Sequence, residues 1–217
     1  MIDTATVLLR VLEHLGYSGL ALGIAALIAV PLGLYIGHTG RGSWMIAGAN
    51  ALRALPSLGL MTLLVLLIGA GVVPPTIALV ILAVPPILSN TAAGISVADP
   101  AAVDAARAMG MTDRQLLRQV ELPIALPLVV SGFRAAVLQV VATATIAAFV
   151  NLGGIGRFIF DGLALYDYGR VVLGAVLVAA VALALDGALA LVARAVTPGR
   201  VGRTRTRPDS ANERVGE

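Results

Sequence analysis

Few residues of this 217-residue chain could carry chemistry, and their types exclude most catalytic sites. The chain has no Cys and no Lys, and its two histidines, His14 and His38, are 24 positions apart. A phosphate-binding loop of the G-x-x-x-x-G-K-[ST] type needs its lysine, and thiol catalysis or a Cys-based zinc site needs cysteine. No H-E-x-x-H pair is present either. We therefore expect no metal site, no P-loop ATP site and no covalent catalysis on this chain, so it should not be an enzyme by itself.

Two charged residues, Arg134 and Asp186, interrupt stretches that are otherwise apolar. A charge inside a membrane must be paired or must reach water. At about 1.5 Å of rise per residue, both side chains fall at comparable depth in the same half of the bilayer. We predict that they pair across two helices. The alternative is that Arg134 extends to the headgroups while Asp186 meets water or a neighbouring hydroxyl.

Neutral polar side chains in the apolar stretches are candidates for lining a translocation pathway. Asn90 and Thr91 follow one another late in one stretch, and Gln139 and Thr143 lie four positions apart in the next. Residues four apart share a helical face, which favours a common lining for the second pair. The alternative is hydrogen bonding between helices, the commoner role of such side chains in lipid.

The elements that must position these residues follow from a composition of 59% hydrophobic and 12% charged residues. A soluble domain carries about 25% charged residues, so the chain is predicted to lie in a membrane. A spanning helix needs about 20 apolar residues. We predict an all-α integral membrane protein with five transmembrane helices, preceded by an extracytoplasmic segment over 1–17. The spans are expected at 18–37, within 54–98 as two helices separated by a turn at 69–75, at 124–156, and at 171–193.

Arginine bias predicts the orientation, since cytoplasmic loops are enriched in basic residues. With five spans, three arginines fall on one face: Arg10, Arg157 and Arg170. Ten between residues 41 and 207 fall on the other face: Arg41, Arg53, Arg107, Arg114, Arg118, Arg194, Arg200, Arg203, Arg205 and Arg207. We therefore expect the N-terminus outside and the C-terminus in the cytoplasm. The basic tail, 197–217, is expected to be disordered and drawn to anionic lipid, with a purely topological role as the alternative. This placement of charge indicates a membrane rather than nucleic acid as the partner.

One long polar segment, 99–123, separates the third and fourth predicted spans. Asp99 before Pro100 is a typical helix start, and Gly110 can adopt the left-handed conformation that ends a helix. Thr112 and Gln115 then form a capping box for a second helix, which Pro123 is expected to end. The segment therefore predicts two short helices joined at a glycine. On residues alone, an amphipathic hairpin lying on the bilayer surface is an equal alternative to a protein-docking element.

The residues of this segment resemble the E-A-A-x3-G-x9-I-x-L-P loop of binding-protein-dependent ABC importer permeases, with Asp in place of Glu and Val in place of Ile. The spacing agrees at every position of the motif, which reads here as Asp104, Ala105, Ala106, Gly110, Val120, Leu122 and Pro123. The resemblance extends over about 13–194. Further pieces, at 55–57, 90–95 and 153–160, are similar to the osmoprotectant branch of the family, the permeases for glycine betaine, carnitine and choline.

The resemblance implies a permease domain over 18–196, with a cytoplasmic coupling loop over 99–123 that docks on a separate ATPase subunit. It implies that ATP and Mg²⁺ bind on that partner and that the chain dimerises with itself or a related permease. It also implies an extracytoplasmic solute-binding protein and a place in the bacterial cytoplasmic membrane. The expected function is import of osmoprotectants; an amino acid or another small solute is the alternative, and a stand-alone secondary transporter is a further one.

Overall fold

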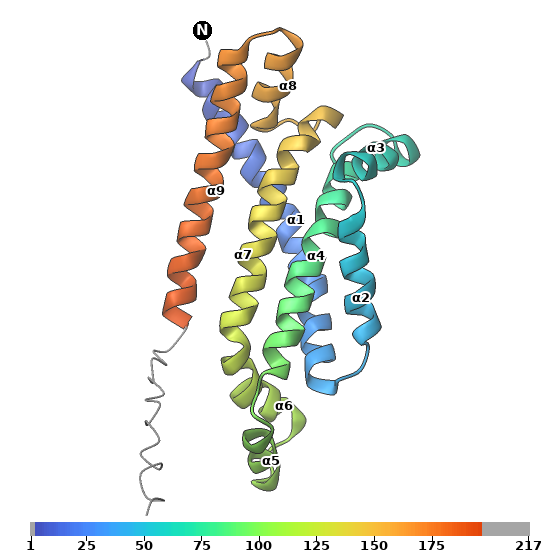
Figure 1. Ribbon diagram of the computed structural model, residues 1–217, viewed down its shortest axis with the longest axis vertical. Helices are drawn as coiled ribbons and strands as arrows, with labels where there is room; N and C mark the ends of the chain where they lie inside the picture. The colour runs from blue at the N-terminus through green and yellow to red at the C-terminus, as the bar shows by residue number, and fades with distance from the viewer. Residues whose placement is uncertain (1–2, 197–217) are drawn as a thin grey trace, which may run out of the picture.

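The computed structural model describes residues 3–196, and the regular structure in that range is entirely helical. Long helices run side by side, with two short helices projecting from one end and another short helix at the opposite end (Figure 1). We call these the hairpin end and the α8 end. The elements are α1 Thr4–Thr39, α2 Ser43–Ala51, η1 Leu52–Ala54, α3 Ser57–Ile68, α4 Val73–Ser96, α5 Pro100–Ala108, α6 Asp113–Leu116, η2 Leu117–Glu121, α7 Leu122–Ala147, η3 Ala148–Val150, α8 Gly156–Ala164 and α9 Tyr168–Val196. The predicted tail over 197–217 lies outside the described residues.

The first helix begins earlier than the expected span at residue 18. α1 is continuous over 36 residues from Thr4, so residues 4–17 are its first turns rather than a separate segment. Two side chains in this part join it to distant regions: His14 Nε2 lies 3.1 Å from the carbonyl oxygen of Val141, and Glu13 accepts a hydrogen bond from the amide of Gly154 at 2.9 Å. The charge-free run that defined the predicted span marks only part of this helix. Which face of the membrane residues 1–17 occupy stays a prediction.

The second predicted span is divided by a sharp bend. α2 and η1 rise beside α4, and α3 then turns by 94° after Leu55 and Pro56 (Figure 1). The expected start of this span at residue 54 therefore leaves out its first part, α2 and η1. Pro56 has no amide hydrogen and its ring restricts the preceding residue, so Leu55 is extended and the helix cannot continue through it. The turn expected near 69–75 is present between α3 and α4.

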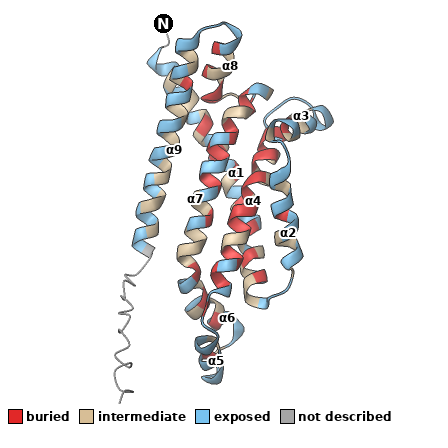
Figure 2. Ribbon diagram, in the orientation of Figure 1, coloured by how far each residue is buried: buried red, intermediate tan, exposed pale blue. Residues whose placement is uncertain are grey.

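The core is built around α4, which packs between α1 and α7 and contains the longest run of buried residues (Figure 2). Close helix approach requires glycine at the crossing points. A Cβ atom at Gly33 of α1 would lie 2.7 Å from Thr91 Cβ, and one at Gly132 of α7 would lie 2.7 Å from Asn90 Cβ. Small residues give this kind of contact in membranes, where burying apolar surface against another helix gains little over contact with lipid.

The helix that follows the short α5 runs without interruption through α6, η2, α7 and η3, over 38 residues from Asp113 to Val150. The expectation that Pro123 ends a separate short helix is wrong. Residues 117–121 form a π-helical turn, and Pro123 lies in the first turn of α7 directly after it. A wider turn shifts the hydrogen-bond register, which accommodates a proline that has no amide to donate.

The last helix, α9, packs against α8 and α7 and leaves much of its surface exposed (Figure 2). Within residues 3–196, four helices are long and apolar enough to cross a membrane: α1, α4, the 113–150 helix and α9. The bent pair of α2 with η1 and α3 makes a fifth crossing if it counts as one span. Within the described range the architecture therefore accommodates the five spans expected from the sequence, with one of them broken.

Candidate functional site

The polar hairpin, residues 99–121, is fixed by local capping. The Asp99 side chain accepts from the amide of Ala101 at 2.9 Å, and both reciprocal bonds of the Thr112–Gln115 capping box are present. At Gly110, φ is +83°, and two hydrogen bonds close the end of α5: Gly110 N to Arg107 O and Met111 N to Ala106 O. This pair of bonds is the Schellman arrangement, which favours glycine at the left-handed position. The hairpin thus holds its shape through its own sequence.

The motif residues divide between the packed and the open side of this hairpin. Ala106 is buried where α5 folds back toward α6 and η2, and Leu116 is fully buried in the same region. Asp104, Ala105 and Gly110 are exposed, and Met109 at the tip is 73% exposed. Val120 and Leu122 are half-buried and Pro123 is exposed, all three on the helix that enters the bundle. The projecting tip is therefore open to a partner, while its base is anchored in the fold.

A polar pair that the sequence analysis missed joins this base to α1. His38 Nδ1 lies 2.6 Å from Glu121 Oε2, and both side chains are largely buried. Glu121 is in the π-helical turn and His38 is next to the last residue of α1. The two are 83 positions apart, so no local spacing indicates the contact.

The two charged residues predicted to pair are in contact. Arg134 of α7 donates from Nε and from Nη2 to the two carboxylate oxygens of Asp186 on α9, the second bond at 2.7 Å. This bidentate arrangement fixes both side chains. It ties α9 to α7 in the half of the bundle toward the hairpin end, away from the contacts of α9 with α8.

The pathway candidates occupy two different environments. Thr143 Oγ1 donates to the Gln139 carbonyl at 2.7 Å, and the Gln139 amide donates to Thr143 Oγ1 at 3.3 Å, so the two form one polar group on α7. Thr91 is fully buried facing Gly33 of α1, and the Asn90 amide donates to the carbonyl of Pro86 in its own helix. The structure therefore groups Gln139 with Thr143 and places Asn90 and Thr91 in helix packing.

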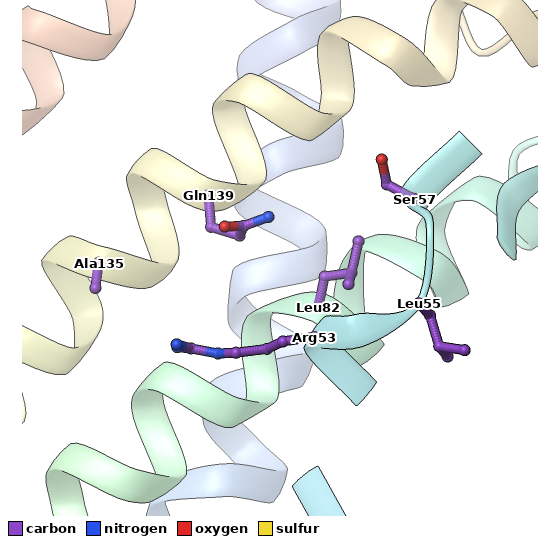
Figure 3. A pocket seen from close by; sticks show the side chains of 6 residues that line it. All are labelled: Arg53, Leu55, Ser57, Leu82, Ala135 and Gln139. Carbon is purple, nitrogen blue, oxygen red and sulfur yellow. The ribbon is translucent and has the colours of Figure 1, made fainter. Parts of the chain in front are cut away.

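Gln139 lines a cavity of about 360 Å³ whose other walls are Arg53, Leu55, Ser57, Leu82 and Ala135 (Figure 3). Arg53 projects from η1 toward the side where α7 carries Ala135 and Gln139. Leu82 is nine residues after the start of α4 and 14 before its end, so the cavity lies near mid-length of the bundle. It is open at the side of the chain, since most of its lining side chains, Arg53 and Gln139 among them, are exposed. Volumes of about 300–1,000 Å³ are typical of small-molecule sites.

Arg53 is the second functional candidate that the sequence analysis missed. Its place just before the long uncharged run predicts a loop, whereas η1 places it beside the middle of α4. The signal that could have found it is Leu55-Pro56, two residues later, which breaks the helix within the span. Without Arg53, nine of those ten arginines remain on the face predicted to be cytoplasmic and three on the other, so the expected orientation is unchanged.

A helical membrane bundle with a projecting capped hairpin and a central polar cavity defines the class of a transport subunit. Among residues 3–196, no three His, Asp or Glu side chains gather closely enough to hold a metal ion. Residues 23–198 match the family of binding-protein-dependent transport system inner membrane components, and the chain belongs to this family. It is therefore a multi-pass permease component of the inner membrane, and membership implies an ATPase and a binding protein as partners.

Curated relatives cover nearly the whole chain. The choline transport system permease protein OpuBB of Bacillus subtilis is 36% identical over 90% of this chain and 91% of its own length. The glycine betaine/carnitine/choline transport system permease protein OpuCB of the same organism is 36% identical over 86% of each chain. The osmoprotectant import permease protein OsmW of Salmonella typhimurium is 33% identical over 91% of this chain and 95% of its own.

Solved structures show the same fold. The inward-facing MetNI methionine ABC transporter aligns with a TM-score of 0.78, covering 91% of this chain and 100% of that chain at 22% identity. At this identity the likeness speaks for the fold and not for the solute. The expected architecture, a helical ABC importer permease core, is confirmed.

Proposed function

We propose that this chain is the permease subunit of an ATP-driven importer for osmoprotectants such as glycine betaine, carnitine and choline. The observation that carries the mechanism is the capped polar hairpin, whose exposed tip around Met109 and Gly110 suits the groove of a cytoplasmic ATPase. The solute class rests on the relatives at 33–36% identity, which are named for choline, carnitine, glycine betaine or osmoprotectant transport. An amino acid as solute has weaker support, because the methionine transporter is only 22% identical.

In this proposal the hairpin end faces the cytoplasm of a bacterial cell and the N-terminus lies outside. ATP and Mg²⁺ bind on the ATPase subunits, and their closure pulls the hairpins of two permease copies together. Asp104, Ala105, Ala106, Gly110, Val120, Leu122 and Pro123 are the coupling residues of each copy. A second permease, identical or related, completes a pathway that one chain cannot enclose. A solute-binding protein delivers the solute to the α8 end. Gln139 contributes to the lining, and Thr143, buried behind it, holds the Gln139 amide.

A labelling experiment tests the orientation and the docking together. Because the chain contains no Cys, single cysteines at Met109 and at Tyr166, which is 80% exposed near α8, give one reactive thiol each. A membrane-impermeant maleimide should label Met109→Cys only from the cytoplasmic side, and bound ATPase should protect it. Tyr166→Cys should react only from outside, with or without the ATPase. Labelling of Met109→Cys from outside would overturn the proposal.

Uptake measurements test the solute class. Deletion of this gene alone should abolish accumulation of labelled osmoprotectants but leave amino-acid uptake unchanged. Accumulation that continues when the ATPase is inactivated would contradict an ATP-driven importer.

A further inference from the structure

The central cavity contains a positive charge that neither the hairpin mechanism nor the helix packing uses. The Arg53 side chain makes no ion pair or hydrogen bond with another residue in the part of the chain that the structure describes. A guanidinium near the middle of a membrane is unfavourable unless it faces water or an anion. The cavity that Arg53 lines provides such an environment.

We propose that this cavity is a carboxylate-recognition site, in which Arg53 binds the carboxylate of a zwitterionic solute during its passage. Arginine suits this role because its planar donors match the two oxygens of a carboxylate. Ser57 and Gln139 add a hydroxyl and an amide to the same cavity. Ser57 is also the first residue of the 12-residue α3, and the positive end of a helix adds to the field of Arg53.

The other walls indicate which end of the solute is recognised. Quaternary ammonium groups are usually held by the faces of aromatic rings. The remaining lining residues are Leu55, Leu82 and Ala135, and none is aromatic. Arg53 also repels a cation. The site therefore favours carboxylated solutes such as glycine betaine and carnitine over choline, which carries positive charge and no carboxylate. This specificity rests on the proposed function and narrows it.

The test uses the whole complex, reconstituted in vesicles with its ATPase and binding protein. Initial uptake of labelled glycine betaine, carnitine and choline is measured for the native chain and for Arg53→Gln. Because the binding protein is unchanged, a change in selectivity reports on the permease. Loss of a charge-assisted bidentate contact should lower the maximal rate for glycine betaine and carnitine about tenfold or more. Choline uptake should stay within about twofold, since choline has no group for Arg53 to bind.

Three further variants keep the test decisive if Arg53→Gln assembles poorly. Arg53→Lys keeps the charge without the planar donors, so its carboxylate rates should be intermediate. Gln139→Glu places a carboxylate in the same cavity, and it should lower glycine betaine uptake and spare choline. Arg41→Gln, in the loop between α1 and α2, is the matched control and should leave all three rates unchanged. Co-purification with the ATPase checks assembly of each variant.

The outcomes separate this site from the proposed function. Equal losses for all three solutes in Arg53→Gln, unchanged glycine betaine uptake, or a native complex that moves only choline would overturn the carboxylate site and leave osmoprotectant import standing. A native complex that moves none of the three would overturn the proposed function and this site with it.

Discussion

His38 Nδ1 and Glu121 Oε2 are 2.6 Å apart, and through them the end of α1 is joined to the turn that leads from the polar hairpin into the bundle. Glu121 is 5% exposed, so its carboxylate depends on this partner. A buried polar group that loses its partner is destabilising by roughly 1–3 kcal/mol. The pair therefore ties the position of the end of α1 to that of the hairpin base.

Replacing His38 should uncouple ATP hydrolysis from transport. In His38→Ala we expect the ATPase to bind and hydrolyse ATP while solute imported per ATP falls about tenfold, the effect of about 1.4 kcal/mol of lost coupling. Glu121→Gln can still hydrogen-bond to His38 and should retain part of the coupling. Thr39→Ala, which removes bonds only to nearby backbone, the Tyr35 carbonyl and the Arg41 amide, is the control. An unchanged ratio of import to hydrolysis in His38→Ala would show that the pair is not a coupling element.

The left-handed backbone at Gly110 makes a second prediction. A β-branched residue is strained at φ +83°, whereas asparagine tolerates this region. No atom outside the local backbone lies within 4 Å of a Cβ built there, so the strain, rather than a clash within the chain, decides the outcome. We expect Gly110→Val to insert normally but to lose ATPase co-purification and transport, and Gly110→Asn to retain both. Normal co-purification of the Val variant would argue against docking through this turn.

The contact between Arg134 and Asp186 should behave as a single unit. Arg134→Asp or Asp186→Arg alone places two like charges in contact between α7 and α9, so each should lower the amount of folded protein extracted from the membrane. The exchanged pair, Arg134→Asp with Asp186→Arg, should recover most of what either single change loses. Size-exclusion profiles of the three variants measure this. A double variant no better than the worse single one would mean that the two residues act independently.

The closest crossing of α4 and α7 predicts a packing effect. A Cβ at Gly132 would meet Asn90 Cβ at 2.7 Å and the Pro86 carbonyl at 2.8 Å. Gly132→Val should therefore destabilise the bundle by about 1–3 kcal/mol, the usual effect of overpacking. Gly23→Val on α1 is the matched control, because no neighbouring atom lies within 4 Å of a Cβ there. Thermal unfolding in detergent compares the two, and equal melting temperatures would refute the close crossing.

The sequence predicted best those features that depend on neighbouring residues. The caps at Asp99, Gly110 and Thr112 are present because each is a contact within a few residues of backbone. The helical class and the number of apolar stretches follow from composition and from the positions of the uncharged runs along the sequence. Pairing of Arg134 with Asp186 was expected from depth, since each charge in lipid needs a partner at its own level.

Features set by distant residues were missed. No local spacing relates His38 to Glu121. The uncharged run borders Arg53 whether that residue lies in a loop or at mid-bundle, so the run cannot locate Arg53. Proline usually ends a helix, so Pro123 predicts a stop, but the π-helical turn before it shifts the hydrogen-bond register and accommodates the missing amide donor. Hydropathy measures how apolar a segment is and not how it bends, so it does not predict the 94° turn after Pro56.

The uninterrupted helix from Asp113 to Val150 has a consequence for how the two surfaces of the molecule communicate. Its 38 residues extend about 57 Å, from the hairpin to the loop before α8, so a tilt of about 10° about one tip displaces the other by about 10 Å. Under the proposed function a partner docks at each tip of this helix. Because thermodynamic linkage is reciprocal, the factor by which docking at one tip changes affinity at the other applies equally in the reverse direction. In that proposal a single helix relays solute delivery toward the ATPase and nucleotide state toward the binding protein.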